Sequence, residues 1–323
     1  MQCSLFSVVL AVMLVFSHVT LAAEATEVPK APEPDKSGDS PINPTPAAET
    51  PKAPEQDKSG YSLINPTPRD LMRDMDTDRP DKTNTPRTVD AGHFQLETGV
   101  FNYNFTRDTS GPNDVSTTTM TLGQFNLRVG LLNNLEFNAA VNSYLFQKSV
   151  DHVALQTSHQ CGNGDTVLGG KFNFFGNDGE DHPLKIALGI QPQFKLPTAQ
   201  RDLGNNHFEF TVGIPFALAL PDDFQLGLQT TPGQERNSAN TGYVTGWQNS
   251  VTLHHPLVVK NLDSYIEFWS QAGTEKHRLT QSTFDTGVIY QLNSNMTLDT
   301  GVNLGLNRQT TKVECFLGIS VRF

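Results

Sequence analysis

The twelve residues KVECFLGISVRF, Lys312 to Phe323, alternate between apolar and polar side chains almost without exception. Successive side chains of an extended strand point to opposite faces. One face would carry Val313, Cys315, Leu317, Ile319, Val321 and Phe323. The other would carry Glu314, Gly318, Ser320 and Arg322, with Phe316 as its one bulky apolar side chain. The stretch therefore predicts a β-strand with one apolar face that continues to an aromatic residue at its end.

The same period of two runs through the chain from Gly92 onward. Its clearest instances are LKIALGIQPQFKL (184–196) and FEFTVGIPFALAL (208–220), each 13 residues long. Strands of globular proteins have a mode of about 5–6 residues, whereas a tilted transmembrane strand needs about 9–11. A soluble sandwich also alternates, but its strands are shorter, so length favours transmembrane strands. Pro192 and Pro215 lie inside these strands and predict bulges or local bends, because proline removes a ladder hydrogen bond.

The region contains twelve candidate strands, which start near Gly92, Thr117, Leu135, Gly164, Leu184, His207, Asp223, Tyr243, Leu262, Leu279, Asn295 and Lys312. Short turns such as LNN (132–134) and NSN (293–295) alternate with longer connections such as QKSVDHVALQTSHQCGN (147–163). An even strand number with short turns at one end is typical of an outer-membrane barrel, and closure satisfies the backbone groups that lipid cannot. The sequence predicts an all-β fold, a 12-stranded antiparallel transmembrane β-barrel over residues 92–323, preceded by a disordered Pro-rich linker.

The N-terminal region predicts an exported protein. LFSVVLAVMLVF (5–16) is an apolar run too short to span a bilayer and is followed by small residues, so residues 1–23 read as a secretory signal peptide. A 22-residue repeat follows, and ten of the 20 prolines lie in residues 29–68. We expect residues 24–75 to form a disordered Pro-rich linker, either a periplasmic tether or a function-poor spacer. Residues 76–91 would form a periplasmic segment that leads into the barrel.

Composition and motifs argue against several classes of function. The net charge of −11 argues against nucleic-acid binding, and the mean hydropathy of −0.37 argues against a helical membrane protein. SHQC (158–161) near His152 has only one thiol, and Asp76, Asp78 and Asp81 lack the glycine and distal glutamate of an EF-hand, so we expect no metal site. The chain has no GxSxG motif. We expect no enzyme and no cofactor.

A motif that precedes the first predicted strand is more specific for one protein family than the alternation of the strands, which is common to all barrels. MDTDRPDKTNTPRTVDAGHFQLETG (75–99) contains TDRPD, formed by Thr77, Asp78, Arg79, Pro80 and Asp81, and then GHFQLE at the start of the first strand. With the long strands and Phe323, it resembles the outer-membrane transporter family associated with the meta-cleavage pathway of phenol degradation. The resemblance covers about Thr77 to Phe323 and leaves out the repeat. It implies a 12-stranded pore for aromatic or other hydrophobic small molecules, without implying phenol itself.

If the apolar stripes face lipid, the opposite faces line the lumen. The predicted lumen-facing residues are Arg128, Lys171, Lys185, Lys195, Glu209, Tyr265, Glu267, Trp269, Asp285 and Asp299. Charges of both signs inside a barrel can pair into networks that narrow or gate a pore. Tyr265 and Trp269 are in a position to stack on an aromatic solute.

Two functions remain open from the sequence. The first is a passive outer-membrane pore or transporter for small, hydrophobic or aromatic compounds. The alternative is a structural or surface-interaction barrel with a plugged lumen and no transport, since barrels of eight strands fill while those of 16 conduct. The expected location is the bacterial outer membrane. The expected partners are its lipid, the small-molecule solute and the barrel-assembly machinery, whose recognition signal Phe323 resembles.

Overall fold

The computed structural model describes residues 57–109, 112, 114–178, 185–200, 203–275, 280–308 and 310–323. The predicted signal peptide and residues 24–56 of the predicted linker lie outside the described residues. From Lys58 onward the chain forms one compact unit. It contains a short 3-10 helix, η2 (Arg69–Leu71). In the described part of the chain, no helix is long and apolar enough to cross a membrane.

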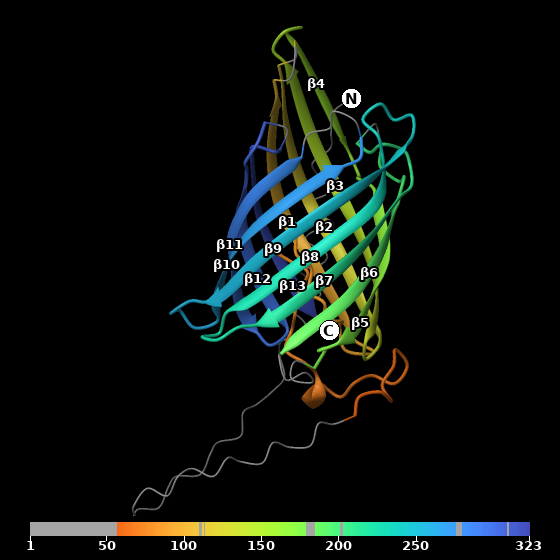
Figure 1. Ribbon diagram of the computed structural model, residues 1–323, viewed down its shortest axis with the longest axis vertical. Coiled ribbons are helices and arrows are strands. Elements are labelled where there is room, and N and C mark those ends of the chain that lie inside the picture. The colour runs from red at the N-terminus through yellow and green to blue at the C-terminus, as the bar shows by residue number, and fades with distance from the viewer. Residues whose placement is uncertain are drawn as a thin grey trace, which may run out of the picture. The chain divides into compact units, whose positions relative to one another are not determined.

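Within the described residues the unit has these strands: β1 (Phe94–Asp108), β2 (Val115–Leu132), β3 (Leu135–Asp151), β4 (Gln156–Gly162), β5 (Thr166–Phe175), β6 (Ile186–Leu196), β7 (Glu209–Ala219), β8 (Gln225–Arg236), β9 (Tyr243–Pro256), β10 (Leu262–Gly273), β11 (Gln281–Asn293), β12 (Met296–Gly305) and β13 (Val313–Arg322). Strands that follow one another in sequence pair antiparallel, except that β4 and β5 both pair with β3 and not with each other. β1 pairs with both β2 and β13. This last pairing closes the sheet into the barrel of Figure 1.

β4 and β5 are two parts of one barrel strand. β3 pairs with β4 along 145–151 and with β5 along 135–141, so both parts lie on the same side of β3. The fold is therefore a 12-stranded antiparallel barrel, as the sequence predicts. The prediction of a loop over 147–163 is wrong, because a hairpin of β3 and β4 extends there beyond the barrel rim (Figure 1). Both faces of this hairpin are largely polar, so no apolar stripe marked it in the sequence.

The last strand has the two faces that its sequence predicts. Leu317 is 47% exposed on the outer surface, whereas Ser320 is fully buried. Phe316, the apolar exception, is buried inside the barrel, with the Arg79 guanidinium 5.7 Å from its ring centroid. This inward aromatic residue therefore serves a cation–π contact and leaves the outer apolar face unbroken.

The barrel is apolar outside and polar inside. The exposed large side chains include Phe94, Phe268 and Leu304, whereas the fully buried ones are mostly charged or polar, such as Arg128 and Lys171. A soluble sandwich would place its apolar stripes in the core. The inverted arrangement is the one expected of a barrel surrounded by lipid.

The two prolines inside strands do not form bulges. The β6–β7 register is the same at Leu188↔Phe216 and at Pro192↔Val212, and the β7–β8 register is the same on both sides of Pro215. The ladders only lose some paired residues locally, for example between β5 and β6 opposite Pro192. Each proline is tolerated because the neighbouring ladder bonds hold the register without its N–H.

The predicted disordered linker includes residues that the structure shows bound to the barrel. Leu63 N–H donates to the Leu131 carbonyl at 2.8 Å, and Thr67 N–H donates to the Ala91 carbonyl at 2.9 Å. His93 Nε2 lies 2.7 Å from the Thr67 carbonyl oxygen. Residues 58–75 are therefore bound to the barrel instead of forming a disordered linker, because their backbone groups find partners at its short-turn end.

These faces predict a contrast between two arginine substitutions. Leu317→Arg places a cation against lipid and should reduce the stability of the barrel by roughly 2–4 kcal/mol, with a clear loss of the folded, heat-modifiable band on gels. Gln225→Arg is the matched control, because Gln225 is exposed and lines cavities inside the barrel. If the control abolishes the folded band and Leu317→Arg does not, the two faces are assigned backwards.

A plugged barrel lumen as the candidate functional site

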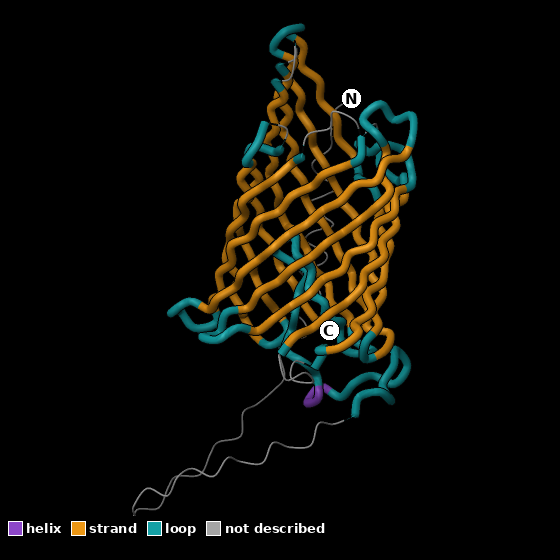
Figure 2. The backbone as a smooth tube through the Cα atoms, viewed as in Figure 1, coloured by secondary structure: helices purple, strands orange, loops and turns teal. Residues whose placement is uncertain are grey.

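Residues 73–91, named the plug from here on, lie among the inward-facing side chains of the barrel. Figure 2 shows this segment as a loop inside the short-turn half of the strands. It contacts side chains of β1–β3, β5, β6 and β8–β13. The sequence predicted a segment leading into the barrel over residues 76–91, and the contacts instead place it within the barrel. The polar lumen and the plug together form the candidate site.

Arg128 of β2 is the central cation of the wall. Its guanidinium donates two hydrogen bonds to Glu136 of β3, at 2.9 and 3.0 Å, and one to Glu97 of β1 at 3.0 Å. It also donates to the plug, at the Arg87 carbonyl (2.9 Å) and the Asp76 carbonyl (3.2 Å). The Arg128, Glu97 and Glu136 side chains are fully buried. One buried arginine therefore joins three neighbouring strands to the plug backbone, with its donors satisfied.

The TDRPD motif forms the part of the plug that reaches furthest around the wall. Asp78 accepts a hydrogen bond from Lys171 of β5 at 2.6 Å, and its N–H donates to Glu97. Arg79 pairs with Asp299 of β12 at 2.8 Å. Asp81 lies 2.8 Å from His254 Nε2 of β9. Successive charged residues of one motif are thus bound to strands on different sides of the lumen.

Residues 82–84 extend the attachment to β6 and to β8–β11. Lys82 pairs with Asp285 of β11 at 2.8 Å, and its ammonium lies 4.9 Å from the Trp269 ring centroid. Thr83 donates its hydroxyl to Glu267 of β10 at 2.6 Å and lies 2.7 Å from the Ser250 hydroxyl of β9. Asn84 bonds Gln191 and Gln229, on β6 and β8. Neighbouring plug residues thus satisfy inward polar groups that would otherwise be buried without partners.

Glycines on the wall make room for the plug. A side chain at Gly189 would collide with the Pro86 carbonyl, one at Gly130 with the Asp90 carbonyl, and one at Gly318 with the Arg79 guanidinium. These are close approaches between the wall and the plug, which only a residue without Cβ allows. Glycine inside these strands therefore has a packing role.

The start of the plug is held at the short-turn end by Asp178. This carboxylate pairs with Lys58 at 2.6 Å and with Arg73 at 3.5 Å. Burial acts to raise the pKa of Asp178, but the hydrogen bond from Lys58 and the charge of Arg73 outweigh it, so the pKa lies below its usual value. A lowered carboxylate pKa stabilises the fold at neutral pH. That contribution is lost only as the pH falls below the usual range of an aspartate.

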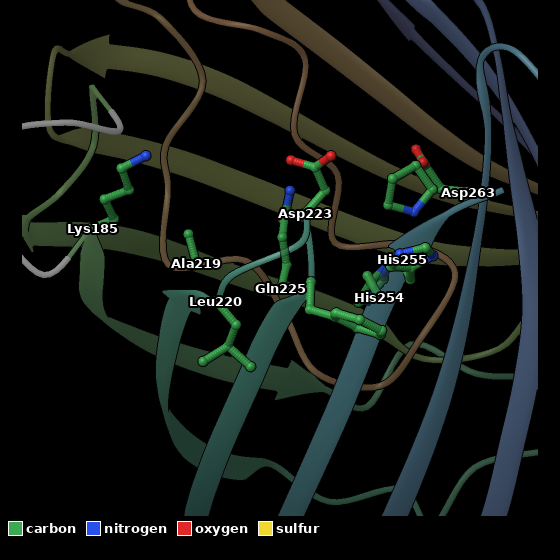
Figure 3. A pocket seen from close by; sticks show the side chains of 10 residues that line it. Lys185, Ala219, Leu220, Asp223, Gln225, His254, His255 and Asp263 are labelled. Carbon is green, nitrogen blue, oxygen red and sulfur yellow. The ribbon is translucent and has the colours of Figure 1, made fainter. Parts of the chain in front are cut away.

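The plug leaves space beside it. A cavity of about 610 Å³, the plug cavity, lies between residues 73–87 and the wall from β7 to β12. A second cavity of about 280 Å³, the mouth cavity, lies at the short-turn end and shares Ala219, Gln225, His254 and Asp263 with the first. Figure 3 shows the mouth cavity with His254, His255 and Asp263 near one another. Phe224 packs on His255 with ring centroids 4.2 Å apart.

The predicted lumen-facing residues fall into three groups. Those that lie in the lumen around the plug are Arg128, Lys171, Tyr265, Glu267, Trp269, Asp285 and Asp299. Lys195 and Glu209 pair with each other at 2.9 Å on β6 and β7, away from the plug. Lys185 precedes β6 with an exposed side chain and lines the mouth cavity, where it lies apart from the other labelled residues in Figure 3. Its φ of 50° turns the chain before the strand begins.

The two predicted aromatic platforms have other partners. Tyr265 is only 1% exposed, and its ring lies close to Gly287 and Gly301 of the neighbouring strands. Trp269 faces the Lys82 ammonium. His254 contacts both Asp81 and the Tyr265 ring. The signal for a plug was present in the excess of charged inward positions, which require partners that the strands alone do not supply.

The Arg128 cluster predicts a large and specific loss of stability. Arg128→Gln should destabilise the barrel by roughly 3–5 kcal/mol, because it leaves buried Glu97 and Glu136 without their cation. The measurement is the temperature at which the folded band is lost on gels. Arg107→Gln is the control, because Arg107 pairs with Asp114 at an exposed site and should change this temperature little. Equal effects of the two substitutions would contradict the central role of Arg128.

A solved outer-membrane structure has a similar fold at low sequence identity. An outer membrane channel from Pseudomonas putida F1 is 12% identical, with a TM-score of 0.55, and the match covers 77% of this chain and 100% of the channel. The translocator domain of the autotransporter NalP from Neisseria meningitidis is 10% identical, with a TM-score of 0.46, over 71% of this chain and 88% of that domain. The first likeness concerns the fold alone, and we draw nothing from the second. No curated protein matches the chain in sequence.

The family relationship rests on the sequence of the barrel and the plug together. The match begins at Thr77, the first residue of the TDRPD motif, and continues through every barrel strand to Phe323. The chain thus belongs to the family described as "Putative MetA-pathway of phenol degradation", which it matches over residues 77–323.

Proposed function

We propose that this protein is a bacterial outer-membrane barrel that lets small, hydrophobic or aromatic compounds pass between the plug and the wall. The observation that carries the proposal is the plug cavity of about 610 Å³, which adjoins the mouth cavity and shares lining residues with it. Volumes of about 300–1,000 Å³ are typical of sites for small molecules. Passage is passive and requires no cofactor or catalytic residue.

The lining favours small aromatic compounds that carry a polar group. The Phe224 and His255 rings offer a flat surface at the mouth, and His254 lies beside Tyr265 with ring centroids 5.5 Å apart. Thr252, Gln225 and Gln291 add hydrogen-bonding groups. Aromatic rings favour offset stacking on other rings, and polar substituents need partners when they leave water. The family description, which names phenol degradation, supports the same class of solute.

A structural barrel without transport is the second candidate. The observation in its favour is the attachment of the plug to most strands through buried ion pairs such as Asp78–Lys171 and Arg79–Asp299. Such a plug would seal the lumen and leave the outer hairpin of β3 and β4 as the working surface. The two candidates differ in whether the purified protein conducts.

The cellular context of the proposal follows from the sequence and the lipid-like exterior. Residues 1–23 would direct export as a signal peptide, and residues 24–56 would act as a spacer. The outer apolar face would meet the lipid of the outer membrane. Recognition of Phe323 by the barrel-assembly machinery stays a prediction.

Planar-bilayer conductance of the purified protein tests the proposal. We expect discrete conductance steps that persist when the plug is fixed, because the proposed path runs beside it. Thr83→Cys with Ser250→Cys, in a Cys315→Ser background, fixes the plug by a disulfide where the two hydroxyls now lie 2.7 Å apart. A silent bilayer for the unaltered protein would favour the structural barrel instead.

The matched control is a disulfide within the wall. Thr117→Cys with Ser149→Cys replaces hydroxyls 3.0 Å apart on β2 and β3, and neither residue touches the plug. Steps that vanish only in the plug-fixed variant and return with a reductant would mean that the plug must move. That outcome would contradict the proposed path beside a fixed plug.

A further inference from the structure

The apolar outer surface is shallower on β8–β10 than on β6 and β7. On β6 every outward residue from Ile186 to Leu196 is apolar, and the same holds on β7 from Phe210 to Leu218. On β8 the continuous apolar row stops after Leu228. The outward positions of β8–β10 then include a set of uncharged polar residues, named the polar sector: Thr230, Gln234, Thr245, Asn249 and Ser270.

The centre of the polar sector is one row across three strands. Thr230 of β8 pairs with Asn249 of β9, and Asn249 pairs with Ser270 of β10. Asn249 lies seven residues from Pro256 at the short-turn end of β9. At about 3.3 Å per residue and a tilt of roughly 40°, Asn249 lies roughly 18 Å above that end, inside an apolar band about 25 Å tall.

The polar sector satisfies only part of its own hydrogen bonding. The Thr230 hydroxyl donates to Asn249 Oδ1 at 2.9 Å and accepts from Trp247 Nε1 at 2.7 Å. Gln234 donates to the Thr245 hydroxyl at 3.0 Å. The exposed Asn249 Nδ2 group has no acceptor among the described residues. Two amide N–H donors inside the apolar band thus face outward.

Acyl chains cannot accept these hydrogen bonds, and an unsatisfied polar group in hydrocarbon is costly. A lipid phosphate needs cations, but the polar sector has none, and Arg236 at its edge is occupied by Asn240 and the Tyr243 ring. Neutral amides and hydroxyls can each both donate and accept hydrogen bonds, so a surface made of them is complementary to a second copy of the same surface. Two identical copies can face each other across it without charge repulsion.

We infer that the polar sector is the contact surface for a second copy of this chain. The contact is isologous about a two-fold axis near Asn249, so that each Asn249 amide donates to acceptors of the partner's sector. The Leu228, Val251 and Phe268 side chains, which form the apolar row beside it, pack at the edge of the same contact. The inference rests on the proposed membrane location and is independent of whether the lumen conducts.

Cross-linking in isolated outer membranes tests the inference. Asn249→Cys in a Cys315→Ser background, treated with a short bismaleimide, should give a band of twice the chain mass. Native Cys315 in the unaltered protein is the matched control, because it is exposed on the outer face of β13, with three strands between β13 and β9. It should give no such band, while Cys161 is buried.

A second variant separates the contact from folding. Thr230→Val with Asn249→Leu makes the row apolar, so it should remain heat-modifiable while its mass in detergent, measured by light scattering, falls from two copies to one. The inference is overturned if the folded Asn249→Cys protein gives no doubled band, if it links to a different protein, or if Cys315 links equally well. A single-copy mass for the unaltered protein would overturn it too. None of these results depends on conductance.

Discussion

The constraint on which this structure depends is the neutralisation of charge inside a narrow closed barrel. Every second side chain of each strand points into the barrel. If these inward positions were apolar, both faces of the strand would be alike, and the side-chain pattern would no longer specify the register. The wall instead carries Arg128, Lys171, Glu267 and Asp299 inward. Buried charges are tolerated only when they are paired and hydrogen-bonded, and the strands alone do not supply enough partners. The plug supplies the rest, which is why it belongs to the fold.

The pairing of the plug with charged wall residues also determines where the plug cavity lies inside the barrel. The charged inward side chains Glu97, Lys171 and Asp299, on β1, β5 and β12, bind the plug directly. On β7 and β8 the inward positions next to the plug cavity include Ala217, Ala219 and Gly227. The cavity is therefore bounded by the charged plug on one side and, on β7 and β8, by a part of the wall that carries several small side chains. The proposed path for a solute therefore leaves the ion pairs between plug and wall intact.

The outer surface has the opposite requirement. Its side chains must be apolar, because lipid chains form no hydrogen bonds with polar groups. Most outward positions follow it, and the row of Thr230, Asn249 and Ser270 does not. Inside the barrel, the plug, which is a segment of the same chain, supplies partners for the polar groups. The exterior has no such segment among the described residues, and this is why we propose a second copy of the chain as the partner of the polar sector.

The sequence by itself determined the barrel. Alternation in KVECFLGISVRF fixes which side chains face out, and strand length with turn spacing fixes the number of strands, because both are local properties of an extended chain. The hairpin of β3 and β4 escaped detection, since water on both faces leaves no apolar stripe. Only the tertiary structure decided that TDRPD lies inside the lumen and that Asp78, Arg79 and Asp81 bind Lys171, Asp299 and His254. Such pairs join residues up to 220 positions apart in the sequence. The charge of a residue does not tell which oppositely charged residue will lie beside it once the barrel has closed.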